Sequence, residues 1–112
     1  MSISVIIIDD HTLVRQGVVS LIQAEPDLVV VGEASSIAEG EALLASTRAD
    51  VMLVDVSLPD GNGIELTRKV REQTAAMGIV VLTMHNDDDT LLSALDAGAS
   101  ALVLKRDRKS VV

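Results

Sequence analysis

The amino-acid sequence predicts a three-layer α/β/α domain, in which a five-stranded parallel sheet is covered by helices on both faces. Short aliphatic runs recur along the chain, and the stretches between them space their apolar residues as helices do. The runs are continuous rather than alternating, which is typical of strands buried on both faces. The expected strands are 3–8, 28–31, 51–54, 79–82 and 101–104.

The first run, Ile3 to Ile8, is rich in β-branched residues and ends in the pair Asp9-Asp10. A helix is expected to begin near His11 or Thr12, capped by Asp10 or Thr12. Pro26 and Asp27 are expected to stop this helix. Its apolar positions at helical spacing are Leu13, Gly17, Val18, Leu21 and Ile22.

The second strand leads into Gly32, and a second helix follows it. Ser36 and Glu39 have the spacing of a capping box, in which a hydroxyl caps the helix and a carboxylate lies three residues on. The inner face of this helix is expected to carry Ala42, Leu43 and Leu44. The third strand, 51–54, ends abruptly in Asp55.

The second half of the chain repeats the alternation. Residues 56–63 are turn-forming, and an amphipathic helix follows with Ile64, Leu66 and Val70 on one side and Arg68, Lys69 and Arg71 on the other. The polar loop 86–89 can cap a helix that carries Leu91, Leu92, Ala94 and Leu95. Gly98 is placed to end it in the left-handed conformation. The fourth strand ends in Thr83 and the fifth in Lys105.

Residues 106–112 are too few for a helix that would cover the sheet after the fifth strand. We therefore expect the last helix to be incomplete or missing. A chain without it would expose apolar surface, which invites association.

The composition excludes several classes of function. The formal net charge of −8 argues against a nucleic-acid-binding surface and suits a site that collects cations. The absence of Cys excludes disulfides, thiolate metal sites and a Cys nucleophile, and the absence of Phe, Tyr and Trp excludes stacking on bases. No apolar run is long enough to span a membrane and the start does not look like a signal peptide, so a cytoplasmic location is expected.

Polar residues of distinct types follow the strands. Asp9 and Asp10 follow the first strand, Asp55 the third, Thr83 the fourth and Lys105 the fifth. Parallel strands bring these ends to one edge of the sheet, with neighbouring strands about 4.8 Å apart. Carboxylates crowded in this way repel one another unless a cation lies among them.

This set of residues suits phosphoryl transfer. Hard oxygen ligands with room for several waters favour Mg²⁺. A hydroxyl and an ammonium beside the metal can hold phosphoryl oxygens, and an aspartate can be the nucleophile, giving an aspartyl phosphate. Each residue alone could be a polar strand end, but together they indicate this chemistry.

The motifs resemble the receiver domain of bacterial two-component response regulators. They are I-I-I-D-D-H at 6–11, L-V-D-V-S-L-P-D-G-N-G at 53–63, V-L-T-M-H at 81–85 and D-A-G-A-S-A-L-V-L-K at 96–105. The start of the chain looks most like the subfamily with a C-terminal LuxR-type helix-turn-helix output domain. The resemblance covers 1–112 and implies a flavodoxin-like fold with strand order 2-1-3-4-5. It also implies that the chain is the N-terminal part of a longer regulator.

The resemblance implies a role for each site residue. Asp55 would accept a phosphoryl group from the phosphohistidine of a sensor histidine kinase. Mg²⁺ would be held by Asp10, Asp55 and the backbone carbonyl of Ser57, with Asp9 acting mainly through water. The phosphoryl oxygens would be held by Thr83 and Lys105.

The resemblance also implies partners. A homodimer would form through the fourth helix and fifth strand or through the exposed C-terminal region. DNA would be bound only through an output domain, and no membrane is expected. The chain would be a signalling protein rather than an enzyme, with only its own phosphorylation and dephosphorylation as chemistry.

Two departures from the family pattern bear on switching. Leu102 stands where the family usually has Tyr or Phe, so the usual coupling between that aromatic residue and Thr83 cannot operate in its ordinary form. Arg106 and Asp107 follow Lys105 where many relatives have Pro. A receiver that binds partners without responding to phosphate therefore stays open as an alternative.

A small Mg²⁺-dependent phosphatase with an Asp nucleophile is a further alternative. Such enzymes generally need a second Asp two residues after the nucleophile, and Ser57 stands there. His11 and His85 are interpreted as satisfied or solvent-facing histidines, with His11 next to the acidic pair. Gly61-Asn62-Gly63 is interpreted as a turn rather than a phosphate cradle.

Overall fold

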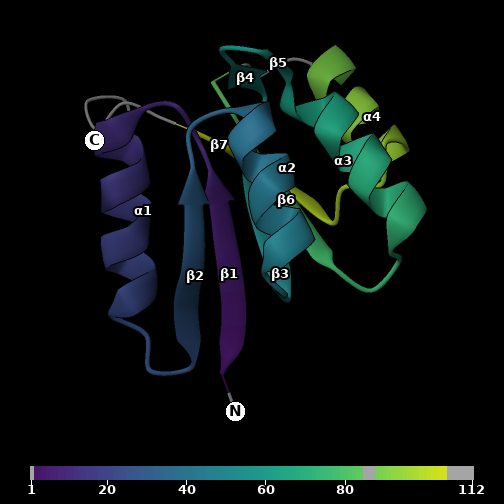
Figure 1. Ribbon diagram of the computed structural model, residues 1–112. Coiled ribbons are helices and arrows are strands. Elements are labelled where there is room, and N and C mark those ends of the chain that lie inside the picture. The colour runs from purple at the N-terminus through teal and green to yellow at the C-terminus, as the bar shows by residue number, and fades with distance from the viewer. Residues whose placement is uncertain (1, 85–87, 106–112) are drawn as a thin grey trace.

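The computed structural model describes residues 2–84 and 88–105. Within them, a parallel five-stranded sheet has the order β2-β1-β3-β6-β7 (Figure 1). The bounds are β1 Ile3–Ile8, β2 Leu28–Ala34, β3 Val51–Asp55, β6 Gly78–Thr83 and β7 Ala101–Leu104. Since β6 and β7 are the fourth and fifth strands of this sheet, the order 2-1-3-4-5 is confirmed.

The helices lie on both faces of the sheet (Figure 1). They are α1 Thr12–Gln23, α2 Ile37–Ser46, α3 Gly63–Gln73 and α4 Asp88–Asp96. Two neighbours on β2 show that α1 and α2 cover opposite faces: Glu33 is paired with Arg15 of α1, whereas a side chain at Gly32 would meet Leu43 of α2. Successive residues of a strand point to opposite faces, so the predicted three layers are present.

The main core lies between the sheet and the helices α2, α3 and α4 that cover one of its faces. It combines strand residues with buried side chains of α3 and α4, and Leu43 and Leu44 of α2 pack against it. Ala42 is exposed, so that part of the predicted inner face is wrong. The strand residues in the core are Ile6, Ile8, Ala34, Met52, Val54, Ile79 and Val81.

The other face is covered less completely. The deepest side chains of α1 are only partly buried, and they are Arg15, Val18, Val19 and Ile22. Leu13 and Leu21 are 84% and 74% exposed, although their spacing is helical. The spacing therefore predicted the helix, but these two leucines lie on its solvent side.

The first helix begins without the predicted cap. His11 is the N-cap residue, and among the described residues its side chain makes no capping hydrogen bond. At α2 the Ser36 hydroxyl accepts from the Glu39 N–H at 3.1 Å, as predicted. The Glu39 carboxylate, however, binds the backbone N–H and hydroxyl of Ser35 rather than Ser36.

A two-stranded hairpin, β4 Ser57–Leu58 and β5 Gly61–Asn62, stands where only a turn was predicted. The later elements agree better with prediction. Gly98 has φ 101°, the left-handed conformation expected after α4, although α4 already begins at Asp88, inside the expected capping loop.

The ladder between β1 and β2 contains a bulge. Val5 pairs with Val30, but Ile6 pairs with Gly32, so the ladder passes over Val31. Beyond the bulge, Ile8 pairs with Ala34 and both side chains lie in the core.

No helix within residues 2–84 and 88–105 has the length and apolar character needed to cross a membrane. The expectations for His85, for Arg106 and Asp107 and for the last helix lie outside the described residues.

Candidate functional site

The carboxyl ends of the strands converge, as the sequence predicted. The sheet register pairs Ile8 with Val54 and Asp55 with Leu82, so the residue after β1 and the last residue of β3 lie side by side. The backbone N–H of Lys105 donates to the carbonyl of Thr83 at 2.6 Å, which brings the end of β7 to the same edge.

Lys105 joins two buried carboxylates. Its Nζ lies 3.0 Å from Asp9 Oδ2 and 3.1 Å from Asp55 Oδ2. Asp9 is 0% and Asp55 2% exposed, and the Lys105 side chain is 8% exposed. Buried carboxylates are costly unless they are paired, so this shared ammonium is a condition for the site to exist.

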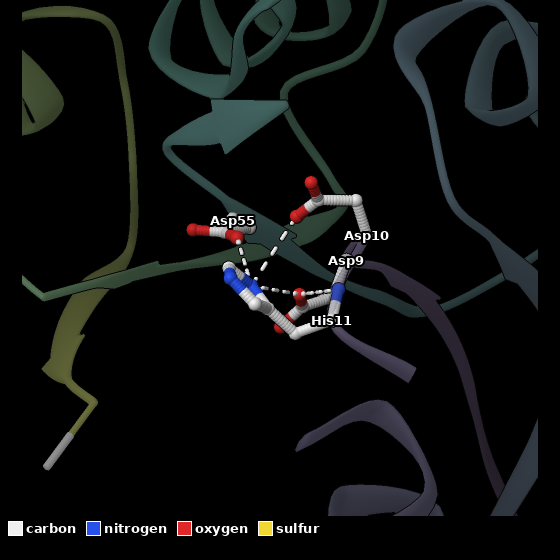
Figure 2. A group of neighbouring side chains, drawn as sticks. All are labelled: Asp9, Asp10, His11 and Asp55. Atoms are coloured by element: carbon white, nitrogen blue, oxygen red, sulfur yellow. Dashed lines mark hydrogen bonds and ion pairs between the residues drawn. The ribbon is translucent and has the colours of Figure 1, made fainter. Parts of the chain in front are cut away.

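Figure 2 shows that the His11 ring points into the carboxylates rather than away from them. Its Nδ1 lies 3.3 Å from Asp9 Oδ1, 3.2 Å from Asp10 Oδ1 and 3.5 Å from Asp55 Oδ2. From the sequence, His11 was placed next to the acidic pair, as a residue to cap the helix or line the site, and the structure shows it lining the site. Its position after Asp9-Asp10 was the only signal, because the direction of a ring cannot be read from a motif.

The backbone of the acidic turn, residues 9–11 after β1, is held by hydrogen bonds from two sides. Asp9 Oδ1 accepts from the His11 backbone N–H at 2.9 Å. Arg15, one turn into α1, donates to the Asp9 backbone carbonyl from Nη1 and to Glu33 Oε1 from Nε at 3.1 Å. Arg15 was missed by sequence reasoning, since a basic residue early in a helix has many solvated explanations.

The loop after Asp55 is packed tightly against the strand end. The Ser57 backbone N–H donates to Asp55 Oδ1 at 3.3 Å, and the Gly63 N–H donates to the Val56 carbonyl at 2.8 Å. A side-chain carbon built on Gly63 would lie 2.0 Å from the Asp55 carbonyl oxygen. Glycine is therefore required there by close backbone approach rather than by a turn.

Asp60, at the tip of the β4–β5 hairpin, caps α2. Its two carboxylate oxygens accept from the backbone N–H groups of Ile37 at 2.7 Å and Ala38 at 3.0 Å. These hydrogen bonds lower the pKa of the Asp60 carboxyl below its usual value. The loop that follows Asp55 is thus fastened to the neighbouring helix.

The two buried carboxyls have opposite pKa shifts. Burial raises the pKa of each, but at Asp9 the hydrogen bonds from the His11 N–H and from Lys105 outweigh burial, so the Asp9 pKa is lowered. At Asp55 burial outweighs the attraction of Lys105, and the charge of Asp9 adds to it, so the Asp55 pKa is raised. Asp55 is thus the carboxyl of this pair that gains most from a nearby cation.

The donor set fits a divalent cation. Asp9, Asp10, His11 and Asp55 each offer one ligand atom, and these atoms lie within 4.8 Å of one another. In the part of the chain that the structure describes, the three carboxyl groups of this cluster outnumber the Lys105 ammonium, which contacts two of them, so negative charge is in excess. Ser57 lies in β4 two residues after Asp55, and Thr83 is fully buried at the end of β6.

The comparisons with known proteins agree with this geometry. A family model described as the response regulator receiver domain matches residues 5–111. The DNA-binding transcriptional activator DevR/DosR of Mycobacterium tuberculosis is 46% identical over 103 residues, which cover 92% of this chain and 48% of that protein. The chain spans about half the length of the curated relatives it matches.

Solved structures match as well. A two-component response regulator of the LuxR family from Aurantimonas superimposes with a TM-score of 0.88 at 35% identity, covering 98% of this chain and 79% of that one. RcsB from Salmonella enterica serovar Typhimurium, solved bound to a promoter in the presence of a phosphomimetic, gives a TM-score of 0.87 at 30% identity. That match covers 99% of this chain and 56% of RcsB.

Proposed function

The chain belongs to the response regulator receiver domain family, and from this premise we propose that it is switched by accepting a phosphoryl group on Asp55. One observation carries the proposal: a buried carboxylate with a raised pKa lies 3.1 Å from Lys105, at a strand end lined by two further carboxylates. This combination has no evident structural use, because buried like charges destabilise a fold.

The proposed reaction assigns a step to each residue. An oxygen of Asp55 attacks the phosphorus of a kinase phosphohistidine, the P–N bond breaks, and the imidazole leaves with the electron pair. Lys105 pairs with the developing negative charge, and the Thr83 hydroxyl donates to a phosphoryl oxygen. Mg²⁺, held by Asp10, Asp55 and the Ser57 carbonyl with Asp9 acting through water, would neutralise charge on the phosphoryl oxygens.

The proposal extends to partners. The kinase is a sensor histidine kinase, and the chain pairs with a second copy through α4 and β7 or the C-terminal region. The exposed side chains of Leu91, Leu92 and Leu95 on α4 support such pairing. The relatives are described as transcriptional regulators, so we propose that DNA is bound by an output domain for which residues 1–112 are the N-terminal receiver.

A second candidate function is a receiver that binds partners without responding to phosphate. The observation that favours it is Leu102, which packs against the core where the family usually has an aromatic ring. An aliphatic side chain cannot reproduce the swing of a ring, so Asp55 could be phosphorylated without moving the α4–β7 surface.

The test is intact mass after incubation with Mg²⁺ and acetyl phosphate. Wild type should gain a single phosphoryl group, and Asp55→Asn should gain none. Asp60→Asn is the matched control, because it removes a nearby carboxylate that binds α2 instead of facing Lys105. An adduct that persists in Asp55→Asn would overturn the assignment of Asp55. No adduct on wild type would contradict the proposal and favour the second candidate, and so would an adduct that leaves the pairing of copies unchanged.

A further inference from the structure

We propose that His11 supplies a nitrogen ligand to the cation site, so that this site prefers a first-row transition-metal ion to Mg²⁺. The proposal rests on the metal site of the proposed function and adds to it the identity of a fourth ligand. It starts from the direction of the ring, which lies over three carboxylates (Figure 2).

The spacing of the donor atoms fits coordination. Ligands about 2.1 Å from an octahedral ion lie about 3 Å from their neighbours. His11 Nδ1 lies 3.2 Å from Asp10 Oδ1, 3.3 Å from Asp9 Oδ1 and 3.5 Å from Asp55 Oδ2. These three separations are slightly longer than the edges of such an octahedron, and the donor atoms lie within 4.8 Å of one another. Small side-chain movements would therefore bring His11 Nδ1 onto the same ion as Asp10 and Asp55, with Asp9 beside it.

The backbone holds His11 in this place. Its N–H donates to Asp9 Oδ1 at 2.9 Å, and its carbonyl accepts from the Arg15 N–H at 2.9 Å. His11 is also the N-cap residue of α1, a position where a side chain usually binds the free N–H groups of its own helix. The His11 side chain does not cap α1 among the described residues and points to the carboxylates instead.

The neighbours of His11 Nδ1 decide whether this nitrogen carries a proton or an electron pair. Lys105 Nζ lies 3.4 Å away and has donors only, which favours an electron pair on Nδ1. Three carboxylate oxygens lie 3.2 to 3.5 Å away and accept only, so without an ion they favour a proton on Nδ1. A cation bound among these oxygens would take the place of that proton, because a histidine nitrogen binds a metal ion only when it is unprotonated.

The donor chemistry sets the preference among ions. Mg²⁺ is bound by oxygen and keeps several waters, and an imidazole adds little to its binding. Imidazole nitrogen suits first-row transition metals, whose affinity for a mixed nitrogen and oxygen site rises from Mn²⁺ onward. A site that adds the His11 imidazole to the oxygen ligands should therefore bind Mn²⁺ or Co²⁺ more tightly than Mg²⁺.

The first experiment compares wild type, His11→Gln and His85→Gln, which replace the two histidines of the chain one at a time. Calorimetric titration with MgCl₂ and with MnCl₂ gives the affinities. His11→Gln should weaken Mn²⁺ binding at least about tenfold, the lower end of what losing an outer-shell partner of a metal ligand costs. Mg²⁺ binding should stay unchanged, and His85→Gln should match wild type for both ions.

Pulsed EPR of the Mn²⁺-loaded protein supplies a readout independent of affinity. Nitrogen hyperfine coupling from an imidazole should be present in wild type and His85→Gln and absent in His11→Gln. Coupling that survives in His11→Gln, or tighter binding of both ions to that variant, would overturn the proposal. The latter result would mean that the ring competes with the cation.

A second variant, which gains a spectroscopic signal, keeps the proposal testable if His11→Gln fails to fold. The chain has no Cys, so His11→Cys introduces its single thiol. Co²⁺ should then give a thiolate charge-transfer band, and a folded His11→Cys protein without this band counts against the proposal. If Mg²⁺ binds and supports phosphorylation but nitrogen coupling is missing, only the role of His11 fails. If neither ion binds, the proposed metal site fails with it.

Discussion

The Lys105 ammonium lies 3.1 Å from Asp55 Oδ2, and the same ammonium lies 3.0 Å from Asp9 Oδ2. The Lys105 ammonium is therefore shared by two buried carboxylates. Lys105→Met should lower the free energy of unfolding by about 3 kcal/mol, because both carboxylates lose their partner. Lys69→Met, which breaks an exposed ion pair with Glu41, should cost less than about 1 kcal/mol. Urea denaturation followed by far-UV circular dichroism measures both, and equal losses would contradict the pairing.

Asp55→Asn and Asp9→Asn should change stability in opposite directions. The Asp55 pKa is raised on folding, so its charge destabilises the native state at neutral pH, and Asp55→Asn should add about 1 to 2 kcal/mol. This gain should shrink as the pH falls through the raised pKa, where native Asp55 becomes protonated. The Asp9 pKa is lowered, so Asp9→Asn should destabilise the protein above the unfolded-state pKa of Asp.

Urea titrations of these two variants in EDTA, from neutral pH downward, test the difference. The decrease in the free energy of unfolding caused by Asp9→Asn should disappear as the pH falls through the lowered pKa of Asp9. A destabilised Asp55→Asn at neutral pH would show that Lys105 outweighs burial at this position.

Gly63→Ala should destabilise the protein by about 2 kcal/mol, because its new methyl would overlap the Asp55 carbonyl oxygen. The strand end would have to move, so the rate of phosphorylation from acetyl phosphate should fall as well. Gly17→Ala is the control: it lies inside α1, and the described structure leaves the space around it open. It should stabilise the protein by about 0.5 to 1 kcal/mol, which thermal denaturation can measure.

Asp60→Asn should lower the denaturation midpoint, since both Asp60 oxygens accept from N–H groups of α2 and an amide has a single acceptor oxygen and no charge. The lowered Asp60 pKa means that this contribution is present above the unfolded-state pKa of Asp and is lost as the pH falls through the folded-state value. The difference between wild type and Asp60→Asn should therefore vanish in acid. Glu72→Gln, which removes one charge from the exposed side of α3, is the control and should change the denaturation midpoint at neutral pH little.

Thr83→Ala should uncouple phosphorylation from its consequence. Asp55 and Lys105 remain in place, so acetyl phosphate should still add one group by intact mass. The hydroxyl that would bias the two-state equilibrium is gone, so phosphorylation should no longer promote pairing of copies in analytical ultracentrifugation. If phosphorylated wild type and Thr83→Ala associate equally, Thr83 does not transmit the signal.

Much of the site could be predicted because parallel strands end at one edge. The aliphatic runs located β1, β3, β6 and β7, and the residues that follow them then had to meet. This is why Asp9, Asp55 and Lys105 came together as predicted although 96 positions separate the first from the last.

Other features depend on contacts that no local pattern encodes. The cap that Asp60 forms on α2 joins residues 23 positions apart, and a loop aspartate has many possible partners. The direction of the His11 ring depends on carboxylates from two strand ends. Helical spacing at Leu13 and Leu21 identified a helix, but the side that faces the sheet is set by where the chain crosses it.

The bulge at Val31 bears on how this strand tolerates changes in length. In a regular β1–β2 ladder without the bulge, Ile8 would pair with Glu33. The Glu33 carboxylate would then point toward α2 and lose its ion pair with Arg15. Deleting Val31 would instead leave a regular ladder in which every later pair is kept. The position of Val31 can therefore accommodate the loss of one residue. An insertion or deletion between Gly32 and Ala34 would instead turn the last residues of β2, which lead into α2, to the opposite face of the sheet.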